Sequence, residues 1–420
     1  MNAQTPSLAA TLSRFVSRLF ARPQVVPADG VVLGSENGKP VVDGSMSPVL
    51  VVGPCRIGKT SAVVVPALLT WRKSAVVLDV QGEVEAVTAM WRKAGAGNKV
   101  RSLDFTATEP TESYNPLDTV RSGTDDELSD LKLIAEVLLP GTDTEAHQLA
   151  RDALVCLMHT SKRAGSGLAG VLGLLNAPDA LGSFLKDWAV RSVVTQAERF
   201  AVDSASAYFR AGYEDRLGVN ALLSTVLRPF SHPILANNTA TSTFKLAELR
   251  HPGAAQTLFV KVKPSDLERV APLLKILFSQ IAMTGDEKAG PLLMVIDDMA
   301  SIGPLHNLHD ELHKLSQRGI KLIAVAQAVS QIEAQYGIDS KFWPCDVSPL
   351  VRLAFGPREH GEIQRLSAAV ARSGLDRIAP VVGNPDQPQV VVFRKNTPAK
   401  YIQPLHYFDS RGYRERAAGP

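Results

Sequence analysis

One stretch of the chain combines residue types at a spacing that could hold a row of phosphates: Gly53-Pro54-Cys55-Arg56-Ile57-Gly58-Lys59-Thr60-Ser61. It fits the pattern G-x-x-x-x-G-K-[ST], in which glycines let backbone N–H groups turn onto phosphate oxygens and a following helix adds its dipole. Lys59 would reach the β- and γ-phosphates, and the Thr60 hydroxyl would ligate Mg²⁺. A glycine turn before an ordinary helix is the alternative, but the apolar strand pattern over Pro48–Val52 favours the phosphate site.

Two carboxylates and an amide stand at the ends of apolar runs much later in the sequence. Asp297 and Asp298 follow the run Pro291–Ile296, and Gln327 follows the run Ile320–Ala326. An apolar strand rarely ends in adjacent acidic residues without a cation nearby, so the pair predicts a cation-binding site. The alternatives are an acidic turn after a buried strand and an amide that only caps a loop.

The segments around these residues read as strands that alternate with helices. A hairpin within Pro23–Ser47 comes first, and helices are expected from Gln81-Gly82-Glu83 through Trp91 and over Val270–Met283. Alternation at this spacing predicts an α/β fold with a mostly parallel, doubly wound sheet flanked by helices. The predicted strands are Pro48–Val52, Ser74–Val80, Lys99–Asp104, Thr257–Val262, Pro291–Asp298, Ile320–Gln327, Leu350–Phe355 and Gln389–Phe393.

The strand pattern disappears between residues 125 and 228, where apolar residues recur at helical spacing. Helical stretches are predicted over Ala169–Leu175, Leu181–Val190 and Ser204–Leu227. The simplest interpretation is an all-α domain inserted into the nucleotide-binding one. We therefore predict an N-terminal segment over residues 1–29, a discontinuous nucleotide-binding domain over 30–124 and 229–410, an inserted all-α domain over 125–228 and a disordered tail over 411–420.

Composition limits the class of protein. The formal net charge is only +3, so contact with DNA must come from a local patch or a pore and not from the whole surface. Cys55, Cys156 and Cys345 show neither metal-binding spacing nor a disulfide framework, which suits a reducing cytosol. No apolar stretch reaches the length that a transmembrane helix needs.

The N-terminal segment is basic and amphipathic. Between Leu8 and Arg22, apolar residues recur at helical spacing, Arg14 and Arg18 continue the basic face, and no acid appears before Asp29. Such a helix could lie on an anionic membrane surface. A helix docked on this protein or on a partner, or a frayed tail, is the favoured alternative.

In this order, the elements resemble those of the TraG-like type IV coupling proteins. The resemblance runs along most of the chain from about residue 30. Besides the phosphate loop, it is carried by Val77-Leu78-Asp79-Val80-Gln81-Gly82-Glu83, Ser113-Tyr114-Asn115-Pro116-Leu117-Asp118, Asp297-Asp298 followed by Ile302-Gly303, Arg318-Gly319-Ile320, Gln327, Ser330-Gln331-Ile332 and Tyr336-Gly337.

The resemblance implies a RecA-like motor ATPase that uses ATP and Mg²⁺ and assembles as a homo-hexamer. Its substrates would be single- or double-stranded DNA, or a relaxase or effector protein, handed to the components of a type IV secretion or conjugation machine. The family usually carries two N-terminal membrane helices, which this chain does not show. It is therefore expected to be cytoplasmic or peripheral at the inner membrane, and its hexamer to be weak alone.

The resemblance also implies roles for single residues. Asp297 would hold Mg²⁺ through water, Asp298 would polarise the attacking water, and Gln327 would sense the γ-phosphate. Glu83 would organise the loop beside the phosphates. The family usually has Glu where this chain has Asp298 and Lys where it has Gln81, so slower hydrolysis is an alternative.

The resemblance also predicts contacts with a neighbouring subunit and with DNA. An arginine from a neighbouring subunit would supply charge in the transition state. Arg318 is the nearest candidate, although the family's arginine corresponds to Ser316, and Arg352 is the next; either could be an ordinary surface arginine. DNA would meet loops that line a central pore, with Lys261 and Lys263 as candidates. A solvated strand end is the alternative for these lysines.

Two other functions stay open. A DNA-pumping ATPase of the FtsK/HerA kind would use the same chemistry, but it should lack the element Tyr114-Asn115-Pro116-Leu117. A nucleotide-binding adaptor would dock secretion substrates through the helical domain with little hydrolysis.

Overall fold

The computed structural model describes most of the chain between Val26 and Gly419. The basic N-terminal stretch up to Arg22, Gln81 and Cys345 lie outside the described part. None of the described helices is long and apolar enough to cross a membrane. The described residues are 26–27, 29–80, 82–109, 112–141, 144–175, 180–190, 193, 195–285, 289–305, 308–337, 351–356, 364, 390–394 and 397–419.

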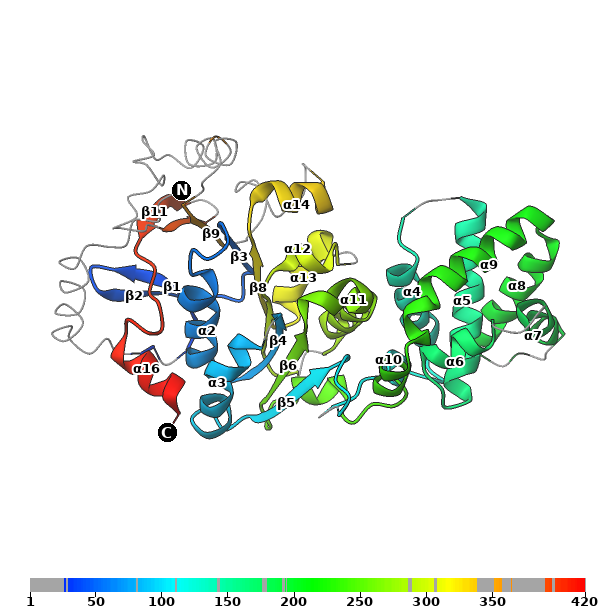
Figure 1. Cartoon of the computed structure of the whole chain (residues 1–420), viewed down its shortest axis with the longest axis horizontal. Helices are drawn as coiled ribbons and strands as arrows, with labels where there is room; N and C mark the ends of the chain where they lie inside the picture. The colour runs from blue at the N-terminus through cyan, green and yellow to red at the C-terminus, as the bar shows by residue number, and fades with distance from the viewer. Residues whose placement is uncertain are drawn as a thin grey trace.

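The core is one large sheet, and its bounds follow the predicted apolar runs closely. The strands are β3 (Val49–Val52), β4 (Ser74–Val80), β5 (Lys99–Asp104), β6 (Gln256–Val262), β7 (Leu292–Ile296), β8 (Ile320–Ala326), β9 (Val351–Phe355), β10 (Val390–Arg394) and β11 (Thr397–Ile402). Their order is β11-β10-β9-β3-β8-β7-β4-β6-β5. Pairing is parallel from β9 to β5, whereas β10 is antiparallel to both β9 and β11. The predicted α/β, RecA-like fold is confirmed (Figure 1).

Helices cover both faces of this sheet. One layer holds α2 (Val65–Thr70), α3 (Glu83–Ala94) and α16 (Arg411–Ala418), and the other holds α11 (Leu267–Met283), α12 (Met299–Ile302), α13 (Leu308–Gln317) and α14 (Val329–Tyr336). Successive strand residues point to opposite layers. Leu50 of β3 lies in one apolar cluster with Leu274 of α11, and Val51 lies in another with Leu68 of α2. Burial on both faces explains why the central strands read as continuous apolar runs.

The predicted hairpin precedes the sheet. It consists of β1 (Val31–Glu36) and β2 (Lys39–Asp43), which pair antiparallel. A buried ion pair ties it to the sheet, because Lys321 Nζ of β8 lies 2.6 Å from Asp43 Oδ2. The hairpin is therefore anchored beside the strands that form the site.

A group of helices lies between β5 and β6 in the sequence and stands to one side of the sheet (Figure 1). Its helices are α4 (Glu127–Leu138), α5 (Glu145–Arg163), α6 (Leu168–Gly173), α7 (Ala180–Ala189), α8 (Gln196–Arg210) and α9 (Tyr213–Leu227), followed by α10 (Pro233–Asn238). The helical stretch predicted over Ser204–Leu227 is divided between two helices. Ala211 has an extended backbone (ψ 151°) and Gly212 caps the next helix with ψ 162°, so α8 and α9 are separate.

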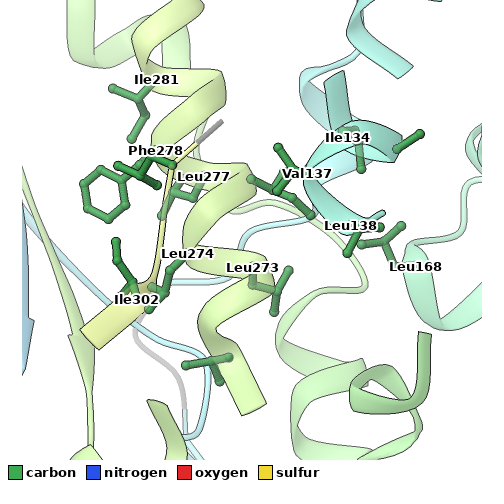
Figure 2. Close-up of a cluster of buried hydrophobic side chains, with 14 of the residues drawn as sticks. Ile134, Val137, Leu138, Leu168, Leu273, Leu274, Leu277, Phe278, Ile281 and Ile302 are labelled. Carbon is green, nitrogen blue, oxygen red and sulfur yellow. The ribbon is translucent and has the colours of Figure 1, made fainter. Parts of the chain in front are cut away.

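The first of these helices, α4, packs directly on α11, one of the helices that cover the sheet. Figure 2 shows Val137 of α4 facing Leu277 of α11, and Leu138 of α4 beside Leu168 of α6. All four side chains are buried and belong to one apolar cluster. The core therefore continues from the sheet into the helical group through α4, and the division into two domains at residue 125 stays a prediction.

The C-terminal residues are ordered, so the expected disordered tail over 411–420 is wrong for residues 411–418. They form α16, which lies beside α3 (Figure 1). Tyr413 is buried in a cluster with Leu69 and Trp91, and its hydroxyl lies 2.9 Å from Thr70 Oγ1. The buried tyrosine and Arg416, whose guanidinium carbon lies 4.9 Å from the Trp91 ring centroid, hold this segment in place.

Candidate functional site

The phosphate loop begins at the end of β3 and leads into a continuous helix, which consists of a first turn over Thr60–Val64 and then α2. That first turn is π-helical. A Cβ placed on Gly53 would lie 2.6 Å from Cβ of Phe355, and one on Gly58, whose φ is +89°, would lie 2.5 Å from the ring of His406. Neither position can hold a larger residue unless its neighbours move, so packing as well as the turn requires both glycines.

The remaining loop residues form its outer rim. Cys55 and Arg56 are exposed, and Pro54 and Ile57 are half-buried. Arg56 has a left-handed backbone with φ +60°. The turn of the loop therefore lies at the protein surface.

Lys59 stands inside this turn. Its Nζ donates to the backbone oxygens of Gly53 at 2.5 Å and Pro54 at 2.9 Å. Burial lowers the pKa of the ammonium group, while Cys55, Asp297 and the neighbouring Asp298 act in the opposite direction. The loop is thus closed around a buried cation whose hydrogen bonds to carbonyl oxygens could be exchanged for bonds to phosphate oxygens.

The predicted metal ligands meet in the structure. Thr60 Oγ1 donates to Asp297 Oδ2 at 2.8 Å, although the two residues are 237 positions apart. Burial raises the pKa of Asp297 to about 6, against the opposing effects of Thr60 and Lys59. A buried carboxylate with a raised pKa is stabilised in its charged form by a cation, and oxygen donors are the ligands that Mg²⁺ prefers.

The chemistry of the donors also fits Mg²⁺ in another respect. Mg²⁺ usually keeps several waters and is held by one or two carboxylates together with substrate phosphates. Thr60 and Asp297 are sufficient for a site of that kind.

Asp298 and Gln327 form the other side of the site. Gln327 Nε2 donates to Asp298 Oδ2 at 3.4 Å, and Gln327 Oε1 accepts from the thiol of Cys55 at 2.9 Å. The amide therefore connects the acidic turn to the phosphate loop. Asp298 has a left-handed backbone with φ +68°, and burial raises the pKa of its carboxyl group.

The order of the strands explains why residues so distant in sequence meet. β3, β8 and β7 are neighbours, and Val52 of β3 pairs with Ala326 of β8. Because parallel strands end at the same edge of a sheet, the residues that follow each strand lie side by side. The loop, Gln327 and the two aspartates are therefore brought together by the sheet alone.

Glu83 lies further along the same edge. It is exposed in the first turn of α3, after β4, and β8 and β7 separate β4 from β3. Its predicted role beside the phosphates stays a prediction. Of the lysines considered for DNA, Lys261 forms an ion pair with Glu85 at 2.9 Å, and Lys263 is exposed.

The structure separates the two candidate arginines from the other site residues. Arg318 precedes β8, at the opposite end of the strand from Gln327, and its Nη1 donates to the backbone oxygen of Ala282 at 3.0 Å. Arg352 of β9 is completely buried within the sheet. The expectation that Arg352 could reach a neighbouring subunit is therefore wrong, because a side chain inside the sheet cannot extend across an interface.

Sequence reasoning missed one residue at the loop. His406 Nδ1 lies 2.9 Å from Ser61 Oγ, and the backbone N–H of Tyr407 donates to the oxygen of Ser61 at 3.0 Å. The two segments are 345 positions apart. No spacing pattern connects them, because the contact depends on the path of the chain after β11.

The profile of the family described as Type IV secretory system Conjugative DNA transfer matches residues 19–343. The conjugal transfer protein TraG of Escherichia coli is 31% identical over 320 residues, which cover 69% of this chain and 50% of that protein. VirD4 of Rhizobium radiobacter is 25% identical over 312 residues, 71% of this chain and 44% of that protein.

The fold has solved counterparts. The bacterial conjugative coupling protein TrwBdeltaN70, in an unbound monoclinic form, superposes with a TM-score of 0.62 at 16% identity, covering 93% of this chain and 92% of that one. TrwB in complex with ADP and Mg²⁺ gives a TM-score of 0.62 at 16% identity, covering 93% and 91%. The chain spans about half the length of the curated relatives it matches. The matched region includes the phosphate loop, the acidic strand end and Gln327, and the chain belongs to the type IV secretory system conjugative DNA transfer family.

Proposed function

We propose that this protein binds ATP with Mg²⁺ and uses ATP hydrolysis to pass DNA or protein substrates to a type IV secretion or conjugation machine. The observation that supports this best is the convergence of Lys59, Thr60, Asp297, Asp298 and Gln327 at one edge of the sheet. Membership of the conjugative DNA transfer family supplies the substrate class, and TrwB, which shares the fold, is known in complex with ADP and Mg²⁺.

Each residue of the cluster has a task in this proposal. Lys59 would exchange its bonds to Gly53 and Pro54 for bonds to the β- and γ-phosphates, and Thr60 and Asp297 would hold Mg²⁺. Bound Mg²⁺ would neutralise charge on the phosphates. Asp298 would accept a proton from, or align, the attacking water, and Gln327 would report the γ-phosphate to the loop through Cys55.

The hydrogen bond between Thr60 and Asp297 predicts how the nucleotide and Mg²⁺ affect each other's binding. The Thr60 hydroxyl favours the charged form of the buried Asp297 carboxylate. Mg²⁺ would take over that task. Binding of the nucleotide and the metal together should therefore be favoured over binding of either alone.

One experiment tests the activity. ATP turnover is measured with and without single-stranded DNA for the wild type, for Lys59→Ala and for the control Lys73→Ala, which removes an exposed lysine away from the loop. We expect loss of turnover in Lys59→Ala alone, with the fold intact, and stimulation of the wild type by DNA. Equal turnover in Lys59→Ala and the wild type would show that this loop is not the site.

A second candidate function is an adaptor that binds nucleotide and docks substrates without turning ATP over. Two observations favour it. Asp298 is one methylene shorter than the glutamate that the coupling proteins usually carry, and Arg318 is hydrogen-bonded within its own chain. ATP binding without turnover, with or without DNA, would support the adaptor.

A further inference from the structure

The nucleoside of a nucleotide held by the phosphate loop must extend away from its γ-phosphate. The sheet order places β8 and β7, which end in Gln327 and the aspartates, on one side of β3. On the other side lie β9, β10 and β11. If the γ-phosphate meets Asp297 and Asp298, the α-phosphate and the nucleoside lie toward β9 to β11.

The described residues on that side include the segment that follows β11. It returns to the loop at His406, whose Nδ1 lies 2.9 Å from Ser61 Oγ. Ser61 follows Thr60 directly, and the backbone N–H of Tyr407 donates to its carbonyl oxygen at 3.0 Å. The segment therefore contacts the last residues of the phosphate loop, at Ser61 and beside Gly58.

This segment also carries an aromatic surface. The rings of His406 and Phe408 are stacked, with centroids 5.0 Å apart and an interplanar angle of 3°. Tyr407 meets Phe408 edge-on, with centroids 5.3 Å apart. Phe408 is 41% exposed, so a flat apolar ring stands at the surface beside the loop. Flat aromatic rings of this kind accept a nucleobase by stacking.

We propose that His406 and Phe408 form the nucleoside side of the nucleotide site, with Phe408 stacking on the base and His406 joining that platform to the phosphate loop at Ser61. This inference rests on the proposed function, because it requires that the loop binds a nucleotide. Stacking tolerates any base. ATP and GTP should therefore depend on Phe408 to the same degree.

A purely structural role is the competing account, in which the segment only braces the loop. Inorganic tripolyphosphate separates the two, because it carries the phosphates of ATP without the nucleoside. A brace would matter equally for both ligands, whereas a base platform would matter for ATP alone.

The experiment measures dissociation constants of ATP, GTP and tripolyphosphate with Mg²⁺ for the full chain. The variants are Phe408→Ala, His406→Ala and Phe408→Trp, with Phe209→Ala as a matched control, since Phe209 is 38% exposed on α8. We expect Phe408→Ala to weaken ATP and GTP at least about fivefold, as for other base–aromatic stacks, and to leave tripolyphosphate within about twofold. Phe408→Trp should retain nucleotide affinity, and Phe209→Ala should match the wild type.

A second readout does not depend on affinity. The tryptophan introduced by Phe408→Trp should lose fluorescence when ATP is added but not when tripolyphosphate is added, relative to the wild type. Equal weakening of all three ligands, or no weakening of ATP in Phe408→Ala, would overturn the inference while leaving nucleotide binding in place. If the wild type bound neither ATP nor tripolyphosphate, the proposed function would fail as well.

Discussion

At the residue scale, Asp298 occupies an unusual position for a group that would act on water. Its left-handed backbone is one that Asp and Asn adopt more readily than Glu. Its Oδ2 already accepts a hydrogen bond from Gln327. The local conformation therefore favours the shorter acid, although the longer one would reach further.

These facts predict the behaviour of two substitutions. Asp298→Asn fits the backbone and should still bind ATP, but it should lower turnover about a hundredfold or more, the usual range for loss of a general base. Asp298→Glu should keep or raise turnover and lower the melting temperature, because Glu is less suited to the left-handed turn. Turnover and melting temperature are measured on the same preparations, and an unchanged rate in Asp298→Asn would remove this residue from the mechanism.

The raised pKa of Asp297 predicts a pH dependence. Its pKa is about 6 in the folded chain, whereas an unfolded chain has about 3.9. Its contribution to stability is therefore fully present below about pH 4 and is lost as the pH rises through about 6. Without Mg²⁺ and nucleotide, Asp297→Asn should be more stable than the wild type at pH 8 by about 1–2 kcal/mol, after allowance for partial solvent contact.

Denaturant unfolding between pH 5 and pH 8 checks this expectation, and the advantage of Asp297→Asn should shrink toward pH 5. A constant difference at every pH would contradict it. Affinity of the wild type for Mg²⁺-ATP should fall as the pH is lowered through about 6, since a protonated carboxyl group is a poor metal ligand.

At the scale of elements, α16 packs against α2 and α3, and α2 belongs to the helix that follows the phosphate loop. Tyr413 is its buried anchor, packed against Leu69 and Trp91. Tyr413→Ala should lower the free energy of unfolding by about 3–5 kcal/mol, the range for removing a large buried aromatic side chain. Tyr213→Ala, at a tyrosine that is 67% exposed on α9, is the control and should change it by less than about 0.5 kcal/mol. Equal effects would mean that α16 does not stabilise the core.

The helical group predicts the outcome of a deletion. Replacing Thr144–Arg228 with a short Gly/Ser linker keeps α4, which packs on α11 (Figure 2). The remaining chain should stay soluble and bind nucleotide, and it should lose substrate recognition first. The deletion also removes Lys162, whose Nζ donates to the oxygen of Leu117 at 2.6 Å. Loss of all soluble protein would show that these helices and the sheet form one core.

The elements differ in how far sequence could predict them. Apolar runs such as Leu292–Ile296 are buried on both faces, so their pattern alone predicted the strands and placed Asp297 and Gln327 at strand ends. β11 was missed because Thr397–Ile402 lies at the sheet edge, where one face of a strand need not be apolar, and the segment includes a proline and a lysine. Contacts across the chain, such as Ser61 with His406, depend on tertiary packing that no local pattern encodes.

At the scale of the whole molecule, Arg318 lies at the end of β8 opposite to the nucleotide site of its own chain. A ring places the nucleotide at the seam between subunits, where an arginine of one completes the site of the next. Arg318 could act there only if a neighbour drew its guanidinium away from Ala282. The ring should then be weak without ligand and strengthened by ATP.

Mixing two inactive variants tests this arrangement. Arg318→Ala keeps Lys59, and Lys59→Ala keeps Arg318, so a mixed ring contains complete sites and should regain part of the turnover. Sedimentation should show a shift from monomer toward hexamer with a non-hydrolysable ATP analogue, and turnover per chain should rise with protein concentration. A nucleotide-insensitive monomer with no rescue on mixing would favour the adaptor.

The order of the strands also has a consequence for synthesis on the ribosome. β3 is made early, yet its sheet neighbours β8 and β9 begin only at Ile320 and Val351. At roughly 5–20 residues per second, β3 waits on the order of tens of seconds for its partners. During that time an apolar strand with free edges is exposed to other chains. Chains that end before Ile320 would leave both edges of β3 unpaired, so we expect premature termination to yield aggregation-prone products and heavy dependence on chaperones.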